Sequence, residues 1–116
     1  MAEWRVVDSY VSGELGLSCV AETAGQIVGY VLGRLAYTPA PVTQSAWIQL
    51  IGVDPAYRHQ SIGRRLVDHL RERCQERGVK MMHITAPAQE VAIHEFLHRC
   101  GFRPAEWMHF SAPVEK

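Results

Sequence analysis

The sequence has no excess of charge of either sign, because its 12 Lys and Arg residues balance its 12 Asp and Glu residues. Nonspecific nucleic-acid binding depends on a basic excess and therefore loses its main electrostatic basis. No run reaches the roughly 18 apolar residues of a membrane span, and no apolar segment follows a basic N-terminus. We expect a cytoplasmic protein that binds neither nucleic acid nor membranes.

Cysteine is scarce as well, and two common phosphate-binding motifs are missing. The three cysteines, Cys19, Cys74 and Cys100, are far apart and form no CxxC pair. This spacing argues against a disulfide framework and against a zinc ribbon. Neither GxxxxGK[ST] nor a GxGxxG after a strand occurs, which excludes the P-loop and the dinucleotide fingerprint.

What is present is ordinary globular composition, with 47% hydrophobic and 21% charged residues in 116. A chain of this length fits one domain with one core, so we expect a single domain over residues 1–116.

Extended segments dominate the first half of the chain. Residues 17–22 and 27–36 are rich in β-forming residues and flank the glycine-containing connector 23–26, which predicts a β-hairpin. The second arm is nearly all apolar, as expected of a central strand buried on both faces. An exposed loop at 37–45 precedes a third strand at 46–53.

The second half alternates helices and strands. Apolar residues recur every four positions from Ser61 and predict an amphipathic helix that ends at Gly78. A strand is expected at 80–86, then a second helix that ends at Gly101, then a strand at 102–110. The strand-helix-strand order implies a parallel crossover, so the class is α/β with a mixed sheet.

The first 16 residues are the hardest to interpret. Residues 4–11 fit either a frayed strand or part of a short helix.

The junction DPAYRHQSIGRR, residues 54–65, places small and basic residues where a helix begins. Helix N-termini carry unpaired N–H groups and partial positive charge, and can therefore hold a phosphate. Ser61 and Gly63 leave room for it, and Arg58, Arg64 and Arg65 add charge. The ordinary alternative is a strand-to-helix turn with a serine cap and solvated arginines.

Residues 50–66, LIGVDPAYRHQSIGRRL, resemble the acetyl-CoA-binding motif [QR]xxGx[GA] of the GNAT superfamily of N-acetyltransferases, often preceded by VDPxY. Arg58 and Gly63 match the outer positions, whereas Ser61 replaces the first motif glycine and His59 lies where many members have glycine. The resemblance implies that the strand pairs with pantetheine and the turn binds the pyrophosphate. The residues it assigns to acetyl-CoA are Ile51, Gly52, Val53, Arg58, His59, Gln60, Ser61, Ile62, Gly63 and Arg64.

A second segment, EVAIHEFLHRCGFRP, is similar to the family's NxxAxxxYxxxGF helix. Gly101 and Phe102 match, but Glu90 lies where many members have asparagine and Leu97 where many have the tyrosine thought to protonate the CoA thiolate. Because only 16 residues precede the hairpin, we expect a GNAT-like mixed central sheet with helices on its faces that lacks the usual first strand and first two helices. The chain is then a short member, a fragment, or one subunit of a homodimer.

The resemblance implies acetyl transfer from acetyl-CoA to a primary amine by direct attack. The alternative is a noncatalytic acyl-CoA-binding or regulatory module. No carboxylate occurs in 46–53 to act as the base. His83, on the same side of its strand as Thr85, is a weak candidate for the base, and Tyr57 for the acid; a structural role is the alternative for each.

His94 and His98 satisfy HExxH as a string, a zinc-binding spacing. No third ligand is evident and the flanking stripe is apolar, so we expect no metal. Trp47, Trp107 and Phe110 either line an acceptor pocket or supply core area.

Overall fold

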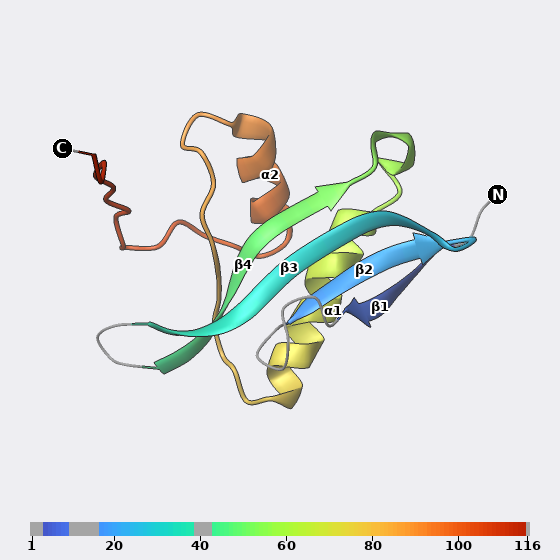
Figure 1. Cartoon of the computed structure of the whole chain (residues 1–116), viewed down its shortest axis with the longest axis horizontal. Helices are drawn as coiled ribbons and strands as arrows, with labels where there is room; N and C mark the ends of the chain where they lie inside the picture. The colour runs from blue at the N-terminus through green and yellow to red at the C-terminus, as the bar shows by residue number, and fades with distance from the viewer. Residues whose placement is uncertain (1–3, 10–16, 39–42, 116) are drawn as a thin grey trace.

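The computed structural model describes residues 4–9, 17–38 and 43–115, and builds them into one five-stranded sheet and two α-helices (Figure 1). The strands lie in the order β1-β2-β3-β4-β5, antiparallel except for the parallel β4–β5 pair. A short 3-10 helix, η1, joins β4 to α1. The elements are β1 (Arg5–Ser9), β2 (Ser18–Thr23), β3 (Gln26–Thr38), β4 (Thr43–Val53), η1 (Pro55–Tyr57), α1 (Ile62–Glu76), β5 (Met82–Ile84) and α2 (Val91–Arg99).

The hairpin, the third strand, the following strand and both helices are confirmed, with different bounds. Strands β3 and β4 extend into residues 37–45, so the expected loop is shorter. Of residues 4–11, for which strand and helix were both open, 5–9 form β1, while 10 and 11 lie outside the described residues. A strand therefore precedes the hairpin, whereas the expected fold lacked the usual first strand.

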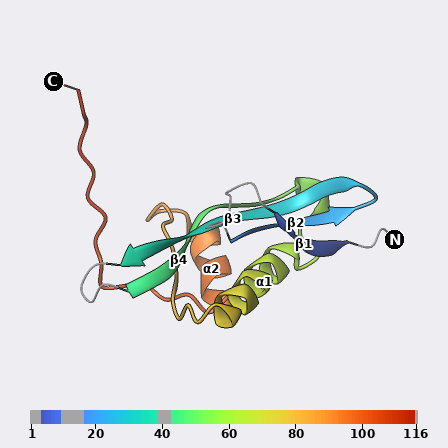
Figure 2. The ribbon, with the colours of Figure 1, turned by 60° about the horizontal axis from the view of Figure 1, so that its bottom comes forward.

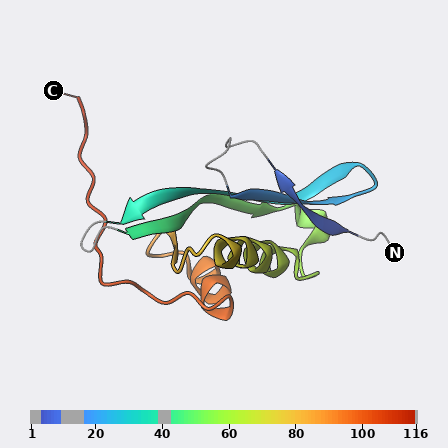
Figure 3. The ribbon, with the colours of Figure 1, turned by 90° about the horizontal axis from the view of Figure 1, so that it is seen from below.

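Both helices lie on the same side of the sheet (Figures 2 and 3). Helix α1 buries Ile62, Leu66 and Leu70 against β2 and β3, and this contact forms the core. The expected mixed sheet with helices packed on it is confirmed, and in the described residues both α-helices cover the same face. One amphipathic stripe on α1 can cover only the face toward which the crossover places it.

Helix α2 joins that layer through contacts with α1. Phe96 lies over Gly63, where an added Cβ would come within 3.1 Å of its ring. Arg64 Nη1 donates to the carbonyl of Arg99 at 2.8 Å, and Arg71 donates to the carbonyl of Cys100. No residue of α2 is fully buried. The helix is thus fixed mainly at its C-terminal end and at one ring.

The opposite face of the sheet is partly open. Strand β3 is central, as expected, but it is not buried on both faces: Tyr30 is 39% exposed and Arg34 is exposed. The Tyr30 ring lies across Gly52 of β4, where an added Cβ would approach its hydroxyl oxygen to 2.8 Å. Gly52 therefore allows this cross-strand contact.

The C-terminal segment contradicts the strand expected at 102–110. Residues 103–115 contain no strand, every one of them is exposed, and the segment leads away from the sheet (Figures 1 and 2). An extended segment becomes a strand only when a neighbouring backbone pairs with it. Among the residues that the structure describes, none does so.

Within the described part of the chain, no helix combines the length and the hydropathy needed to cross a bilayer.

We predict that the three thiols are unreactive in the folded protein. Cys19, Cys74 and Cys100 are almost completely buried, and desolvation raises the pKa of Cys19 to about 12 and raises that of the other two. The reactive thiolate is therefore scarce at pH 8. A colorimetric disulfide reagent should titrate three thiols per chain in denaturant and none under native conditions. Fast native labelling of any thiol would contradict this packing.

Candidate functional site

A cavity of about 700 Å³ opens where β4 ends and α1 begins. All the residues expected to bind acetyl-CoA line it except Gln60. Further lining residues come from β5 and α2. The complete lining consists of Ile51, Gly52, Val53, Tyr57, Arg58, His59, Ser61, Ile62, Gly63, Arg64, Ile84, Ala92, Ile93, Phe96, Leu97 and Arg99.

The cavity exists because β4 and β5 pair only briefly. Their register covers Ala46 to Ile48 on β4, after which β4 continues to Val53 without β5. Residues 51–53 still pair with β3 on the other side. Backbone groups of 51–53 that point away from β3 therefore have no strand partner in the described sheet, and an extended ligand can pair with them.

The turn after β4 is fixed by Asp54. Its carboxylate accepts from the Ala56 N–H at 2.9 Å, its N–H donates to the Val28 carbonyl at 2.8 Å, and Pro55 starts η1. Tyr57 then packs half-buried against the core and also lines the cavity. The VDPxY segment is thus a structural turn that sets the direction of the residues after it, most of which line the cavity.

Two non-glycine residues of this turn have left-handed backbone conformations. His59 has φ 67° and Ser61 has φ 63°. Left-handed residues in a turn gather successive N–H groups into a concave nest that suits an anion. These two positions are those at which the resemblance expects glycine, so the chain keeps the backbone shape without the residue that adopts it most easily.

The helix N-terminus is unpaired, which argues against the simple serine cap. Ser61 occupies the N-cap position, but its side chain makes no capping hydrogen bond. The first backbone bond of α1 runs from Arg65 N to Ser61 O at 3.0 Å. The N–H groups of residues 62–64 therefore have no helical acceptor and remain for a ligand.

The arginines of the turn divide into two groups. Arg58 and Arg64 line the cavity, and Arg99 from α2 joins them. Arg64 is also bonded to Asp68 and to the Arg99 carbonyl. Arg65, expected to add charge here, instead lies 5.4 Å over the ring of Trp4, so that expectation is wrong.

Gly63 has a different role from the one expected. Its φ is not positive, so it needs no special backbone freedom. It is small because Phe96 of α2 occupies the space of a side chain. The motif glycine thus brings one wall of the cavity against α1.

His83 does not line the cavity. It pairs with Trp47 across β4 and β5, with ring centroids 4.5 Å apart and planes at 23°. The neighbouring pairs Ala46–Met82 and Ile48–Ile84 contribute to the core, so alternation places the stacked rings on the open face. Trp47 Nε1 is buried there without a hydrogen-bond partner among the described residues. His83 therefore lies on the open face of the sheet, close to the point where β4 and β5 separate, and not in the cavity.

The other candidate residues from the sequence, His94, His98, Trp107 and Phe110, do not line the cavity. His94 Nε2 donates to the Pro87 carbonyl at 2.7 Å, and His98 is exposed. Nowhere in residues 4–9, 17–38 or 43–115 do three His, Cys, Asp or Glu side chains form a possible metal site. Trp107 and Phe110 lie in the exposed C-terminal segment, 55% and 83% exposed, so they supply neither core nor cavity wall.

The wall contributed by α2 was missed. Ile93 and Phe96 had no expected role in a site, yet both line the cavity together with Leu97. The signal in the sequence was the shortness of this helix, whose nine residues offer little surface to a core.

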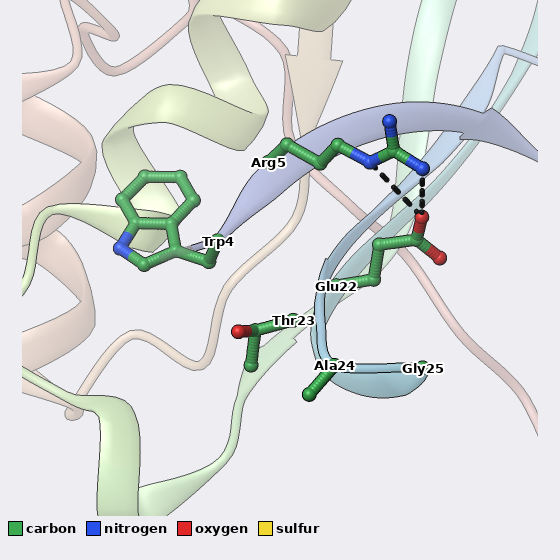
Figure 4. A pocket seen from close by; sticks show the side chains of 6 residues that line it. All are labelled: Trp4, Arg5, Glu22, Thr23, Ala24 and Gly25. Carbon is green, nitrogen blue, oxygen red and sulfur yellow. Dashed lines mark hydrogen bonds and ion pairs between the residues drawn. The ribbon is translucent and has the colours of Figure 1, made fainter. Parts of the chain in front are cut away.

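A second hollow, of about 270 Å³, lies beside the hairpin turn (Figure 4). It is lined by Trp4, the Arg5–Glu22 ion pair and residues 23–25. The ion pair neutralises its charge, and the hollow holds no candidate catalytic group.

We predict that glycine stabilises the turn. The variants His59→Gly and Ser61→Gly should each raise the free energy of unfolding by about 0.5 to 1 kcal/mol, because a left-handed backbone costs other residues roughly 1 to 2 kcal/mol. Urea unfolding measures the change. Ala24→Gly, at φ 48° in the hairpin, should gain similarly, whereas Gln60→Gly, which has no positive φ, should not. A gain at Gln60 equal to that at Ser61 would contradict the strained turn.

Comparison with known proteins gives this geometry a family. No curated protein sequence matches the chain. Among solved structures, a transcriptional regulator from Bacillus halodurans C-125 is 27% identical, with a TM-score of 0.72 over 84% of this chain and 67% of that one. A ribosomal-protein-alanine N-acetyltransferase from Brucella melitensis biovar Abortus 2308 is 19% identical, with a TM-score of 0.72 over 84% and 69%.

A third structure, AAC(6')-Iy in complex with the bisubstrate analog CoA-S-monomethyl-acetylneamine, is 16% identical, with a TM-score of 0.73 over 83% of this chain and 67% of that one. This chain spans about two thirds of the length of all three structures. The model of the acetyltransferase (GNAT) family matches residues 2–102. The chain therefore belongs to the acetyltransferase (GNAT) family, and its cosubstrate is acetyl-CoA.

Proposed function

We propose that this protein transfers the acetyl group of acetyl-CoA to a primary amine, with the acyl donor held in the 700 Å³ cavity. The observation that carries the proposal is the coincidence, in one cavity, of unpaired helix N–H groups and unpaired strand backbone. The first suits a diphosphate and the second suits the amide-containing pantetheine arm.

The diphosphate binds at residues 58–64. The N–H groups of 62–64 and the nest at His59 and Ser61 supply donors, and the helix dipole favours negative charge. Arg58 and Arg99 add cationic side chains at the cavity wall. Arg64 mainly joins α1 to α2, since its guanidinium already bonds to Asp68 and to the Arg99 carbonyl.

The pantetheine arm lies along residues 51–53, which places the thioester near the point where β4 leaves β5. There the amine nitrogen attacks the carbonyl carbon, and a free backbone N–H of β4 stabilises the oxyanion. The C–S bond then breaks, the nitrogen loses a proton and the thiolate gains one. The products are an acetamide and CoA.

His83 accepts the proton of the amine and Tyr57 supplies the proton to the thiolate. His83 lies on the open face at the splay, stacked on Trp47, so the acceptor approaches from the face opposite to the diphosphate. Leu97 lines the cavity where the resemblance expects a tyrosine, but it has no proton to give, whereas Tyr57 lines the same cavity with a phenol.

An amine acceptor agrees with the neighbours' names, which include ribosomal-protein-alanine and aminoglycoside acetyltransferases. The second candidate is a noncatalytic acyl-CoA-binding module. The observation that favours it is Leu97 in the cavity, because the expected acid is absent there.

We predict that a negative charge at Ser61 weakens acetyl-CoA binding. Ser61→Glu should lower the affinity about tenfold or more, because its carboxylate opposes the diphosphate. Ser61→Gln has the same shape without the charge and should bind nearly as the unaltered protein does. Isothermal titration with acetyl-CoA measures both. Equal affinities of the two variants for acetyl-CoA would show that the diphosphate binds elsewhere. Absence of acetyl-CoA binding by the unaltered protein would reject the proposal.

We also predict that His83 is required for turnover rather than for binding. With an amine library and a thiol-release assay, His83→Gln should lower kcat by roughly 10² to 10⁴ while the affinity for acetyl-CoA stays unchanged. His98→Gln, an exposed histidine outside the cavity, is the control and should retain full activity. Acetyl-CoA binding without turnover of any amine would instead support the noncatalytic module.

A further inference from the structure

The three strands around the point where β4 and β5 separate contain one permanently charged residue, Arg34. Strands β3, β4 and β5 otherwise contain no Asp, Glu, Lys or Arg. The Arg34 side chain is exposed and makes no hydrogen bond or ion pair in the part of the chain that the structure describes. An anionic ligand that binds to this guanidinium therefore meets no competing carboxylate on these strands.

The strand register places Arg34 in line with the residues proposed to receive the acceptor. Arg34 is the register partner of Trp47 in the antiparallel β3–β4 pair, and Trp47 is the register partner of His83 in the parallel β4–β5 pair. Register partners share a face of the sheet, so Arg34 lies on the same open face as the stacked Trp47 and His83 rings. The next residue, Leu35, packs against the core, as alternation along the strand requires.

This row of three side chains sets the size of a molecule that can contact both of its ends. Neighbouring strands lie about 5 Å apart, so the backbones of Arg34 and His83 are separated by roughly 10 Å. The long Arg34 side chain can cover part of that distance, and the Trp47 ring between the two ends offers apolar surface to a hydrocarbon chain. An acceptor whose amine lies at His83 thus reaches Arg34 with a group several bonds from its nitrogen.

The charge of the row favours a carboxylate as that group. A carboxylate carries one negative charge and accepts two parallel hydrogen bonds from one guanidinium, whereas a phosphate monoester carries up to two charges at neutral pH. A polycationic acceptor finds no carboxylate on β3, β4 or β5 and meets Arg34 as a like charge. The row therefore suits an amine that carries a single carboxylate.

We propose that the acceptor is an ω-amino acid, a primary amine with a carboxylate at the far end of a short hydrocarbon chain. Its amine lies at His83, its chain lies on Trp47 and its carboxylate pairs with Arg34. The nitrogen forms the amide bond as the C–S bond breaks, one proton leaves the nitrogen and one is added to the sulfur, and the products are an N-acetylated ω-amino acid and CoA. Arg34 determines specificity and takes no part in the bond changes. This inference rests on the proposed function, because it places the amine at His83.

Three acceptors of equal chain length test the charge at the far end. They are 6-aminohexanoate, its neutral amide 6-aminohexanamide, and the cationic hexane-1,6-diamine. With acetyl-CoA and the thiol-release assay, we expect the KM for 6-aminohexanoate to be about three- to tenfold lower than that for the amide, because an exposed charge pair contributes modestly. The two kcat values should be similar, and the diamine should have the highest KM.

Substitution of Arg34 should change this order without changing the cofactor site. Arg34→Gln should bring the KM values for 6-aminohexanoate and the amide to within about twofold of each other, Arg34→Lys should keep the preference for the anion, and Arg34→Glu should make the diamine the preferred acceptor. The affinity for acetyl-CoA and the thermal unfolding of these variants should stay unchanged, since Arg34 is exposed and does not line the cavity. Arg77→Gln, at an exposed position after α1, is the matched control and should keep the order of the unaltered protein.

Equal KM values of the unaltered protein for 6-aminohexanoate and its amide would overturn this inference and leave the proposed function in place. The inference also falls if Arg34→Gln keeps the preference for the anion, or if the protein acetylates other amines of the library but not 6-aminohexanoate. Absence of thiol release with every amine would reject the proposed function as well.

Discussion

Everything that this protein offers a ligand depends on the short parallel pairing of β4 with β5. Three register pairs hold the strands together, and β4 then continues to Val53 paired with β3 but not with β5. Longer pairing would satisfy the backbone of residues 51–53 and close the cavity. Shorter pairing would release β5, whose one described strand neighbour is β4. The buried pairs at Ala46 and Ile48 secure the contact from the core side. A weakly paired strand thus sets both the depth of the cavity and its position.

The turn that follows combines strict geometry with unusual residues. Asp54 fixes the entry, α1 fixes the exit, and His59 and Ser61 adopt left-handed backbones between them. The nest depends on backbone shape, so it survives the loss of the motif glycines at a cost in conformational strain. Side-chain identity matters less here than the two flanking elements that hold the shape.

The elements that can be predicted from the sequence are those with local signals. The four-residue apolar recurrence of α1, the Gly25 turn of the hairpin and the Pro55 stop were sufficient for the main elements. The turn motif also predicted most of the cavity lining. Contacts between distant elements could not be found in this way: Phe96 over Gly63, Arg65 over Trp4 and the exposed residues 103–115 follow from packing, which a local pattern does not contain.

The attachment of α2 has a consequence for how such a cavity changes over evolutionary time. Its side chains form one wall, yet no residue of the helix is fully buried. Substitutions at Ile93 or Leu97 therefore alter the shape of the cavity while the packing of α1 on the sheet keeps its stability. New specificities can be sampled on this wall without the loss of stability that limits change in a core. The protein separates the part that must stay constant from the part that is free to vary.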